Sequence, residues 1–210
     1  KEQELQHHVK IANYWIGQGL ITQKQWRVVA GYPPVNSKIL FSDNPSRFKG
    51  DNNPVEQVSW YQAKEFCDRL SFATGKAYDL PTEAEWEYAC RAGTITAFSF
   101  GDMITPELAN YNGNYTYNNG TKGQSQNKTT PIETYPANLW GIYDMHGNLR
   151  EWCLDHWHDS YADKPEELKQ QGNAAWLSRN EFSKRVLRGG AWDSYPENCR
   201  SAYRNSQTSS

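Results

Sequence analysis

The chain has little of what several common protein classes require. Its 22 lysines and arginines are balanced by 24 aspartates and glutamates, giving a formal net charge of -2, so it lacks the basic excess typical of nucleic-acid-binding proteins. No run approaches the roughly 18 apolar residues of a membrane span, which argues against membrane insertion. The start, KEQELQHHVK, is not a signal peptide and has no initiating methionine, so the chain could be the C-terminal part of a longer protein.

Cysteine is also scarce. The four cysteines, Cys67, Cys90, Cys153 and Cys199, are too few for a small protein held together by disulfides. No pair has the CxxC spacing of a zinc or redox site. We therefore expect buried, reduced thiols.

Aromatic residues, in contrast, are abundant. They make up 14% of the chain and include nine tryptophans, while aliphatic residues are few. This combination predicts an irregular, loop-rich fold with a largely aromatic core. At 210 residues the chain is long enough for one substantial domain and short for two, so we assign 1–210 to a single domain.

Short amphipathic helices are predicted at three places. Each begins with a capping box, a Ser or Thr followed three positions later by Gln or Glu: Thr22 with Gln25, Ser59 with Gln62, and Thr82 with Glu85. Gly75 and Gly93 should end the second and third helices. Strands are expected at 11–16 and 186–187, and a compact turn at 143–152. The fold class is therefore α+β.

The last 26 residues, 185–210, change character after Gly189 and Gly190. The segment beyond them follows neither the helical nor the strand period, and it mixes aromatic residues with short hydrogen-bonding ones, as adaptable contact surfaces do. Its candidate ligand-binding residues are Asp193, Ser194, Tyr195, Glu197, Asn198, Tyr203, Asn205 and Ser206. Trp192, Cys199 and the glycines should lie inside or half inside. The alternative is an ordinary Asn/Ser-rich surface loop.

Four motifs resemble those of the formylglycine-generating enzyme (sulfatase-modifying factor) family. They are NPVEQVSW at 53–60, LPTEAEWEYACRAG at 80–93, GIYDMHGN at 141–148 followed by Glu151-Trp152, and RGGAW at 188–192. The resemblance implies a C-type-lectin-like fold. Members of that family end in a strand containing Gly-Phe-Arg, which this sequence lacks, so we predict that the natural protein continues past Ser210.

The resemblance also bears on catalysis. Oxidases of the family carry two cysteines, five residues apart, after the double glycine; the pair binds copper(I) and oxidises a substrate cysteine. Ser194 occupies the first position here and only Cys199 remains, so we expect no oxidase activity, because a hydroxyl is a poor ligand for this soft ion. Cys67 and Cys90 match cysteines that form disulfides in secreted members, but the partner position of one is Arg204. This favours a reducing, cytoplasmic setting.

The segment RVLRGGAWDSYPENCRSAYRN at 185–205 further resembles the variable proteins of diversity-generating retroelements. In those proteins adenine-directed mutagenesis scatters selected codons while the scaffold stays fixed. Asp, Ser, Tyr and Thr can all be reached from an Asn codon by changing adenines, and most candidate residues are of these types. We therefore predict a non-catalytic protein that binds an unknown protein or small molecule. The alternatives are a copper-dependent oxidase with an incomplete cysteine pair, or a sensory module of a larger signalling protein.

A structural calcium ion is also implied by the family. The matching ligands are the side chains of Asp144 and Glu151 and the carbonyls of Gly147 and Leu149, a set of hard oxygen donors suited to this ion. A second family site would include Asn110. The alternative is a turn-capping Asp144 and a salt-bridged Glu151.

Overall fold

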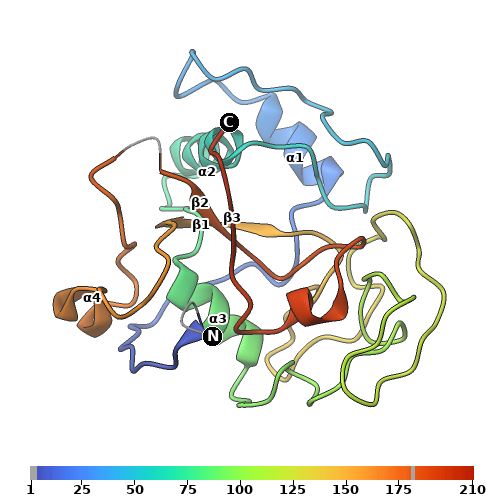
Figure 1. Cartoon of the computed structure of the whole chain (residues 1–210). Coiled ribbons are helices and arrows are strands. Elements are labelled where there is room, and N and C mark those ends of the chain that lie inside the picture. Colours follow the sequence, from blue (N-terminus) through green and yellow to red (C-terminus); the bar gives the residue numbers. More distant parts are fainter. Residues whose placement is uncertain (1–3, 181–182) are drawn as a thin grey trace.

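A computed structural model describes residues 4–180 and 183–210. Three main helices, α1 (Gln23–Ala30), α2 (Trp60–Thr74) and α3 (Glu83–Arg91), precede a small sheet of β1 (Glu151–His156), β2 (Arg185–Arg188) and β3 (Asn205–Gln207). A short helix α4 (Glu166–Gln170) and a 3-10 turn η2 (Pro196–Cys199) complete the regular elements. Long irregular segments join them, as Figure 1 shows, so the expected loop-rich α+β organisation is confirmed.

All three predicted capping boxes form. In each, the Ser or Thr side chain accepts from the backbone N–H three residues later, and the Gln or Glu side chain reaches back to the N-cap N–H. Gly75 ends α2 in the left-handed conformation, with φ of 68°. The expected end of α3 at Gly93 is wrong by one residue, because Ala92 already takes the left-handed cap with φ of 46°.

The sheet has β2 in its centre, antiparallel to β1 on one side and β3 on the other. Val186 and Leu187 therefore lie in a buried strand, as predicted. The predicted strand at 11–16 does not form. Instead the side chain of Asn173 bonds the backbone of Ala12, accepting from its N–H at 2.5 Å and donating to its carbonyl at 3.3 Å. The turn expected at 143–152 gives way to β1 at Glu151.

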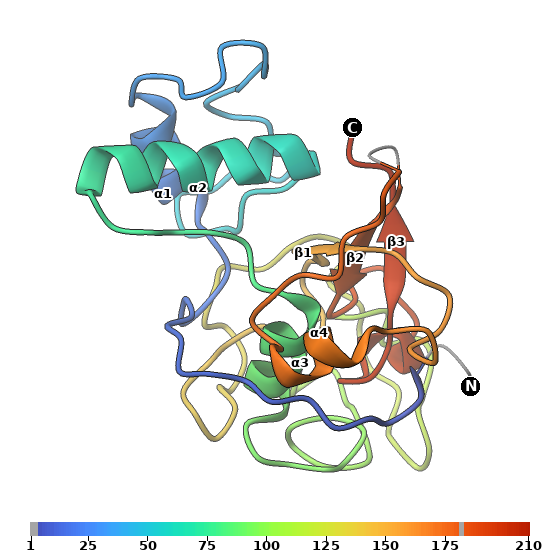
Figure 2. The ribbon, with the colours of Figure 1, turned by 90° about the vertical axis from the view of Figure 1, so that its left-hand side faces the viewer.

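Aromatic residues form much of the core. Trp26 of α1 stacks between Phe41 and Phe66, with ring centroids 4.3 and 5.2 Å apart. Trp86 of α3 is fully buried in a second cluster against the sheet. Figure 2 shows the pair α1 and α2 lying together at one end, with α3 beside the sheet. The four cysteines are free and buried, as expected.

A buried carboxylate binds the two arginines that flank residues 189–203. Glu83, in the first turn of α3, accepts from Arg188 at 3.1 Å and from Arg204 at 2.6 and 2.9 Å. Burial alone would raise the pKa of Glu83, but the two guanidiniums hold it below its ordinary value. Residues 189–203 are thus a loop whose two flanking arginines bind one carboxylate.

Candidate functional site

The loop begins with two glycines that no other residue could replace without movement. Gly189 and Gly190 have φ of 89° and 77°, in the left-handed region. A Cβ on Gly190 would lie 2.5 Å from Sγ of Cys199 and 3.0 Å from the carbonyl oxygen of Asn198. Gly190 therefore lets the start of the loop pack directly on η2.

A tight turn follows, and Ser194 hydrogen-bonds across it to Ala191. Its backbone N–H donates to the carbonyl of Ala191 at 2.9 Å, and its Oγ accepts from the N–H of Ala191 at 2.9 Å. Its carbonyl accepts from the N–H of Asn112 at 3.0 Å. This bond ties the loop to residues 110–130, an asparagine-rich tract. Ser194 is only 3% exposed, so its expected place on the ligand-binding surface is wrong. Its hydroxyl is used to build the turn.

The neighbours of Ser194 point the other way. Asp193, Tyr195 and Glu197 are exposed, whereas Pro196 and Cys199 are buried. From Asp193 to Glu197, therefore, exposed side chains alternate with buried ones, up to the start of η2. Asn198 is half-buried at the end of this row.

The remaining candidates are less exposed than expected. Tyr203 is half-buried, and burial raises the pKa of its phenol while the nearby Arg150 guanidinium opposes the rise. Asn205 and Ser206 are half-buried in β3, opposite Leu187 and Val186, and β3 leads away from η2 (Figure 1). We define the C-terminal face as five residues: Asp193, Tyr195, Glu197, Asn198 and Tyr203.

Two residues that the sequence did not suggest also border this face. Tyr115 is 47% exposed and packs edge-on against Tyr195, with ring centroids 4.6 Å apart. Nη2 of Arg150 lies 3.2 Å from Oγ of Ser194 and 3.6 Å from Oδ1 of Asp193. Tyr115 lies in the asparagine-rich tract, and the tyrosines that recur in this tract are the only sequence feature that could have indicated its place in the site. Nothing in the sequence pointed to Arg150.

Cys199 lies under the face and not on it. Its side chain is fully buried, and burial raises the pKa of the thiol to about 12. The ionised sulfur that binds copper or attacks a substrate is therefore disfavoured here. The partner cysteine of the family is replaced by Ser194, whose hydroxyl is already bonded.

The residues expected to hold calcium lie in the turn before β1 and at the first residue of β1, Glu151. Asp144 and Glu151 are half-buried, and no described basic side chain pairs with either of them. Burial, with smaller help from nearby carboxylates, raises the pKa of Asp144 to about 6 and of Glu151 to about 7. Glu151 accepts from the indole N–H of Trp86 at 2.9 Å, so it is not the salt-bridged glutamate of the alternative.

The backbone of this turn packs closely on the backbone of Asn110. Gly147 has φ of 105°, and a Cβ there would lie 2.3 Å from the carbonyl oxygen of Asn110. Asn110 itself is buried, and its Oδ1 has no hydrogen-bond partner among the described residues. No described group of three or more His, Cys, Asp and Glu side chains could hold a metal. Two half-buried carboxylates without a basic partner are hard oxygen donors of the kind that calcium takes.

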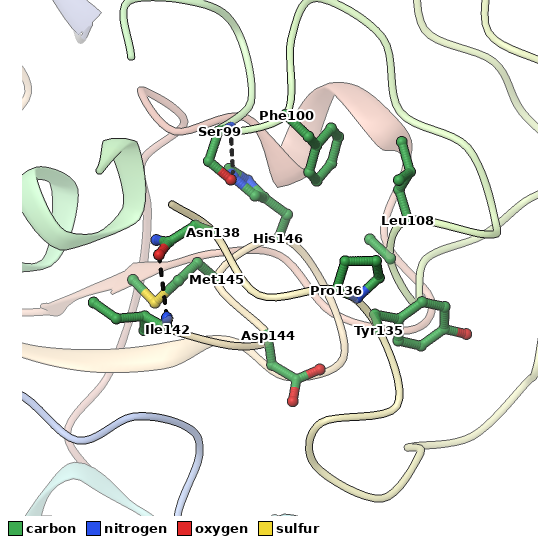
Figure 3. Close-up of a pocket in the computed structure, with 11 residues that line it drawn as sticks. Ser99, Phe100, Leu108, Tyr135, Pro136, Asn138, Ile142, Asp144, Met145 and His146 are labelled. Carbon is green, nitrogen blue, oxygen red and sulfur yellow. Dashed lines mark hydrogen bonds between the residues drawn. The ribbon is translucent and has the colours of Figure 1, made fainter. Parts of the chain in front are cut away.

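A small recess opens beside Asp144 (Figure 3). It has an accessible volume of about 20 Å³, room for about one water molecule. His146 on its wall is buried; Nδ1 lies 2.8 Å from the carbonyl of Cys199, and Nε2 accepts from the N–H of Ser99 at 2.9 Å. Burial lowers the pKa of His146 to about 4, so the imidazole is neutral and structural.

These features define a member of a known family. The sequence model of the Sulfatase-modifying factor enzyme 1-like domain matches residues 1–210, and the chain belongs to that family. Its fold is the α+β, C-type-lectin-like fold that the sequence predicted. No helix in the described part of the chain is long and apolar enough to cross a membrane.

Particular relatives differ in what they are named for. Chaperone protein LppX of Paenibacillus barcinonensis is 30% identical over an alignment of 230 residues, which covers 88% of this chain and 71% of that protein. The formylglycine-generating enzyme of Streptomyces coelicolor is 33% identical over 165 residues, 75% of this chain but only 48% of the enzyme. The structure of Treponema denticola variable protein 1 superposes with a TM-score of 0.73 at 25% identity, covering 97% of this chain and 82% of that one.

Proposed function

We propose that the chain is a non-catalytic binding protein whose C-terminal face takes up a ligand and is diversified in sequence. The observation that carries the proposal is the division of the loop into an inner frame and an outer row. Ser194, Pro196 and Cys199 are buried, whereas Asp193, Tyr195 and Glu197 are exposed. Exposed residues can change without disturbing the frame, because surface substitutions usually alter stability by no more than about 0.5 kcal/mol.

The likeness to a variable protein of Treponema denticola over almost the whole chain supports this proposal. The chemistry of the face also supports it. Tyrosine offers a large, stiff contact area with a polar tip, and Asp, Glu and Asn add adaptable hydrogen bonds. A calcium ion held by Asp144, Glu151 and the carbonyls of Gly147 and Leu149 would, in this proposal, stabilise the turn next to the loop. It would take no part in ligand chemistry.

An oxidase is the second candidate, favoured by the 33% identity to a formylglycine-generating enzyme. Two observations weigh against it. The thiol of Cys199 is buried with a raised pKa, and Ser194 uses its hydroxyl within the turn. A thiolate pair of the kind that binds copper(I) would need both positions open and ionised.

Two libraries with the same number of variants test the proposal. One randomises the C-terminal face, and the other randomises the buried frame residues Ser194, Pro196 and Cys199 together with Ser201, which is also fully buried. We expect most members of the first to unfold cooperatively and some to bind hen egg-white lysozyme after display and selection. Few members of the second should fold. If the face library yields few folded members, or none that bind across several protein targets, the proposal is wrong.

A further inference from the structure

We propose that Tyr115 and Arg150 form a constant part of the binding site and that the partner is a folded protein; this inference rests on the proposed function. Both residues lie outside the segment 185–210, yet both contact residues of the C-terminal face. The site then has two parts. One part can vary, and the other is the same whatever the face carries.

Tyr115 is held in place by the backbone around it. Its N–H donates to the carbonyl of Asn112 at 3.2 Å, and the N–H of Asn112 donates to the carbonyl of Ser194 at 3.0 Å. The side chain of Asn112 accepts from Asn114 and Ser125 at 3.0 and 3.2 Å. The backbone that carries the ring is therefore held by contacts that do not involve the side chain at 195. A pre-ordered tyrosine loses little entropy on binding, which favours affinity.

Arg150 is fixed at one end and open at the other. Its single hydrogen bond among the described contacts goes to Ser194, which is part of the buried frame and does not belong to the variable row. Its ion pair with Asp193 is loose, at 3.6 Å, and both side chains are well exposed, at 39% and 51%. A guanidinium has five N–H donors, so most of them remain available to a partner.

The side chains of the site suit a protein partner better than a small molecule. Small-molecule sites are concave. The recess beside Asp144 and a second recess lined by Lys10, Gln171 and Asn173 contain no residue of the C-terminal face. Tyrosine and arginine are among the residues that most often dominate the binding energy of protein interfaces. An exposed row of polar and aromatic side chains with two such anchors at its border suits a protein surface.

The test uses binders selected from the face library against two unrelated targets, hen egg-white lysozyme and bovine serum albumin. In several binders to each target, Tyr115→Ala and Arg150→Ala are introduced, with Tyr78→Ala as a matched control. Tyr78 is 40% exposed, close to the exposure of Tyr115, but lies after α2, outside the C-terminal face. Melting temperatures check that each variant is folded, and Arg150→Lys provides a milder change at the second position.

We expect Tyr115→Ala and Arg150→Ala to weaken binding about tenfold or more in binders to both targets, with Tyr78→Ala neutral. Should Arg150→Ala lower the melting temperature, the affinities of Tyr115→Ala and Arg150→Lys decide between the outcomes. Binders that keep their affinity in all of these variants would overturn the inference and leave the proposed function intact. A library that yields no binders would instead overturn the proposed function, and this inference with it.

Discussion

Ser194 and Asp193 are adjacent in sequence but should respond very differently to alanine. Ser194 is 3% exposed, and its Oγ accepts from the buried N–H of Ala191 at 2.9 Å. Ser194→Ala removes that acceptor and leaves the N–H without a partner, which costs about 1–3 kcal/mol. Asp193→Ala removes only the loose, exposed pair with Arg150, so we expect a change within about 0.5 kcal/mol.

Urea denaturation followed by tryptophan fluorescence measures both changes, since the chain has nine tryptophans. Each kcal/mol should also shift the melting temperature by about 2–4 °C for a chain of this size. The slope of the transition should stay the same in both variants, so that a lower midpoint reports lower stability. Equal effects of Asp193→Ala and Ser194→Ala would refute the division between frame and surface.

Other predictions concern the ion, catalysis, pH and the buried ion pairs. Chelation with EGTA should lower the melting temperature, because an ion that binds only the folded state stabilises it, and Asp144→Ala should abolish that sensitivity; a melt indifferent to chelator would contradict the calcium site. With copper(I) and oxygen, a sulfatase-type cysteine peptide should not be oxidised, and turnover that disappears in Cys199→Ser would restore the oxidase. Burial lowers the pKa of His146 to about 4 in the folded state, below the value of about 6.5 in an unfolded chain. The stability of the fold therefore loses nothing to this histidine above about pH 6.5, and the free energy of unfolding falls by about 3 kcal/mol as the pH falls to 4. His146→Gln should remove that part of the acid destabilisation, and identical pH profiles would count against it. Glu83→Gln should cost about 3–5 kcal/mol in unfolding experiments, because Arg204 loses this buried carboxylate and Arg188 keeps only that of Glu87; a loss below about 1 kcal/mol would show that the pairs are dispensable.

The helices could be predicted because their signals are local. A capping box needs residues only three positions apart, and Thr22, Ser59 and Thr82 each supply one. The sheet could not be predicted in the same way. Asn205 and Ser206 are polar and follow no alternating pattern, and they form β3 only because they pair with Leu187 and Val186. The predicted strand at 11–16 failed because a distant side chain, Asn173, bonds the backbone of Ala12.

The candidate site, like the fold, could be predicted from the sequence only in part. The residue types of the face were readable from the sequence, and so was the burial of Cys199 and the glycines. Which of two neighbours, Asp193 or Ser194, points outward was not readable, because the loop has no period. Contacts between distant parts of the chain could not be predicted either. Tyr115 contacts Tyr195, 80 positions further on, and Arg150 bonds Ser194, 44 positions further on. The shared carboxylate Glu83 lies 105 and 121 positions from its two arginines.

The most direct measurement of the central claim is deep sequencing of the DNA that encodes residues 185–210, from many individual cells of the source population. A diversified binding face predicts substitutions concentrated in the codons for Asp193, Tyr195, Glu197, Asn198 and Tyr203. The codons for the buried residues Gly190, Cys199 and Arg204 should be constant. A single invariant sequence, or variation spread equally over exposed and buried positions, would contradict the claim that this face is built to vary and to bind.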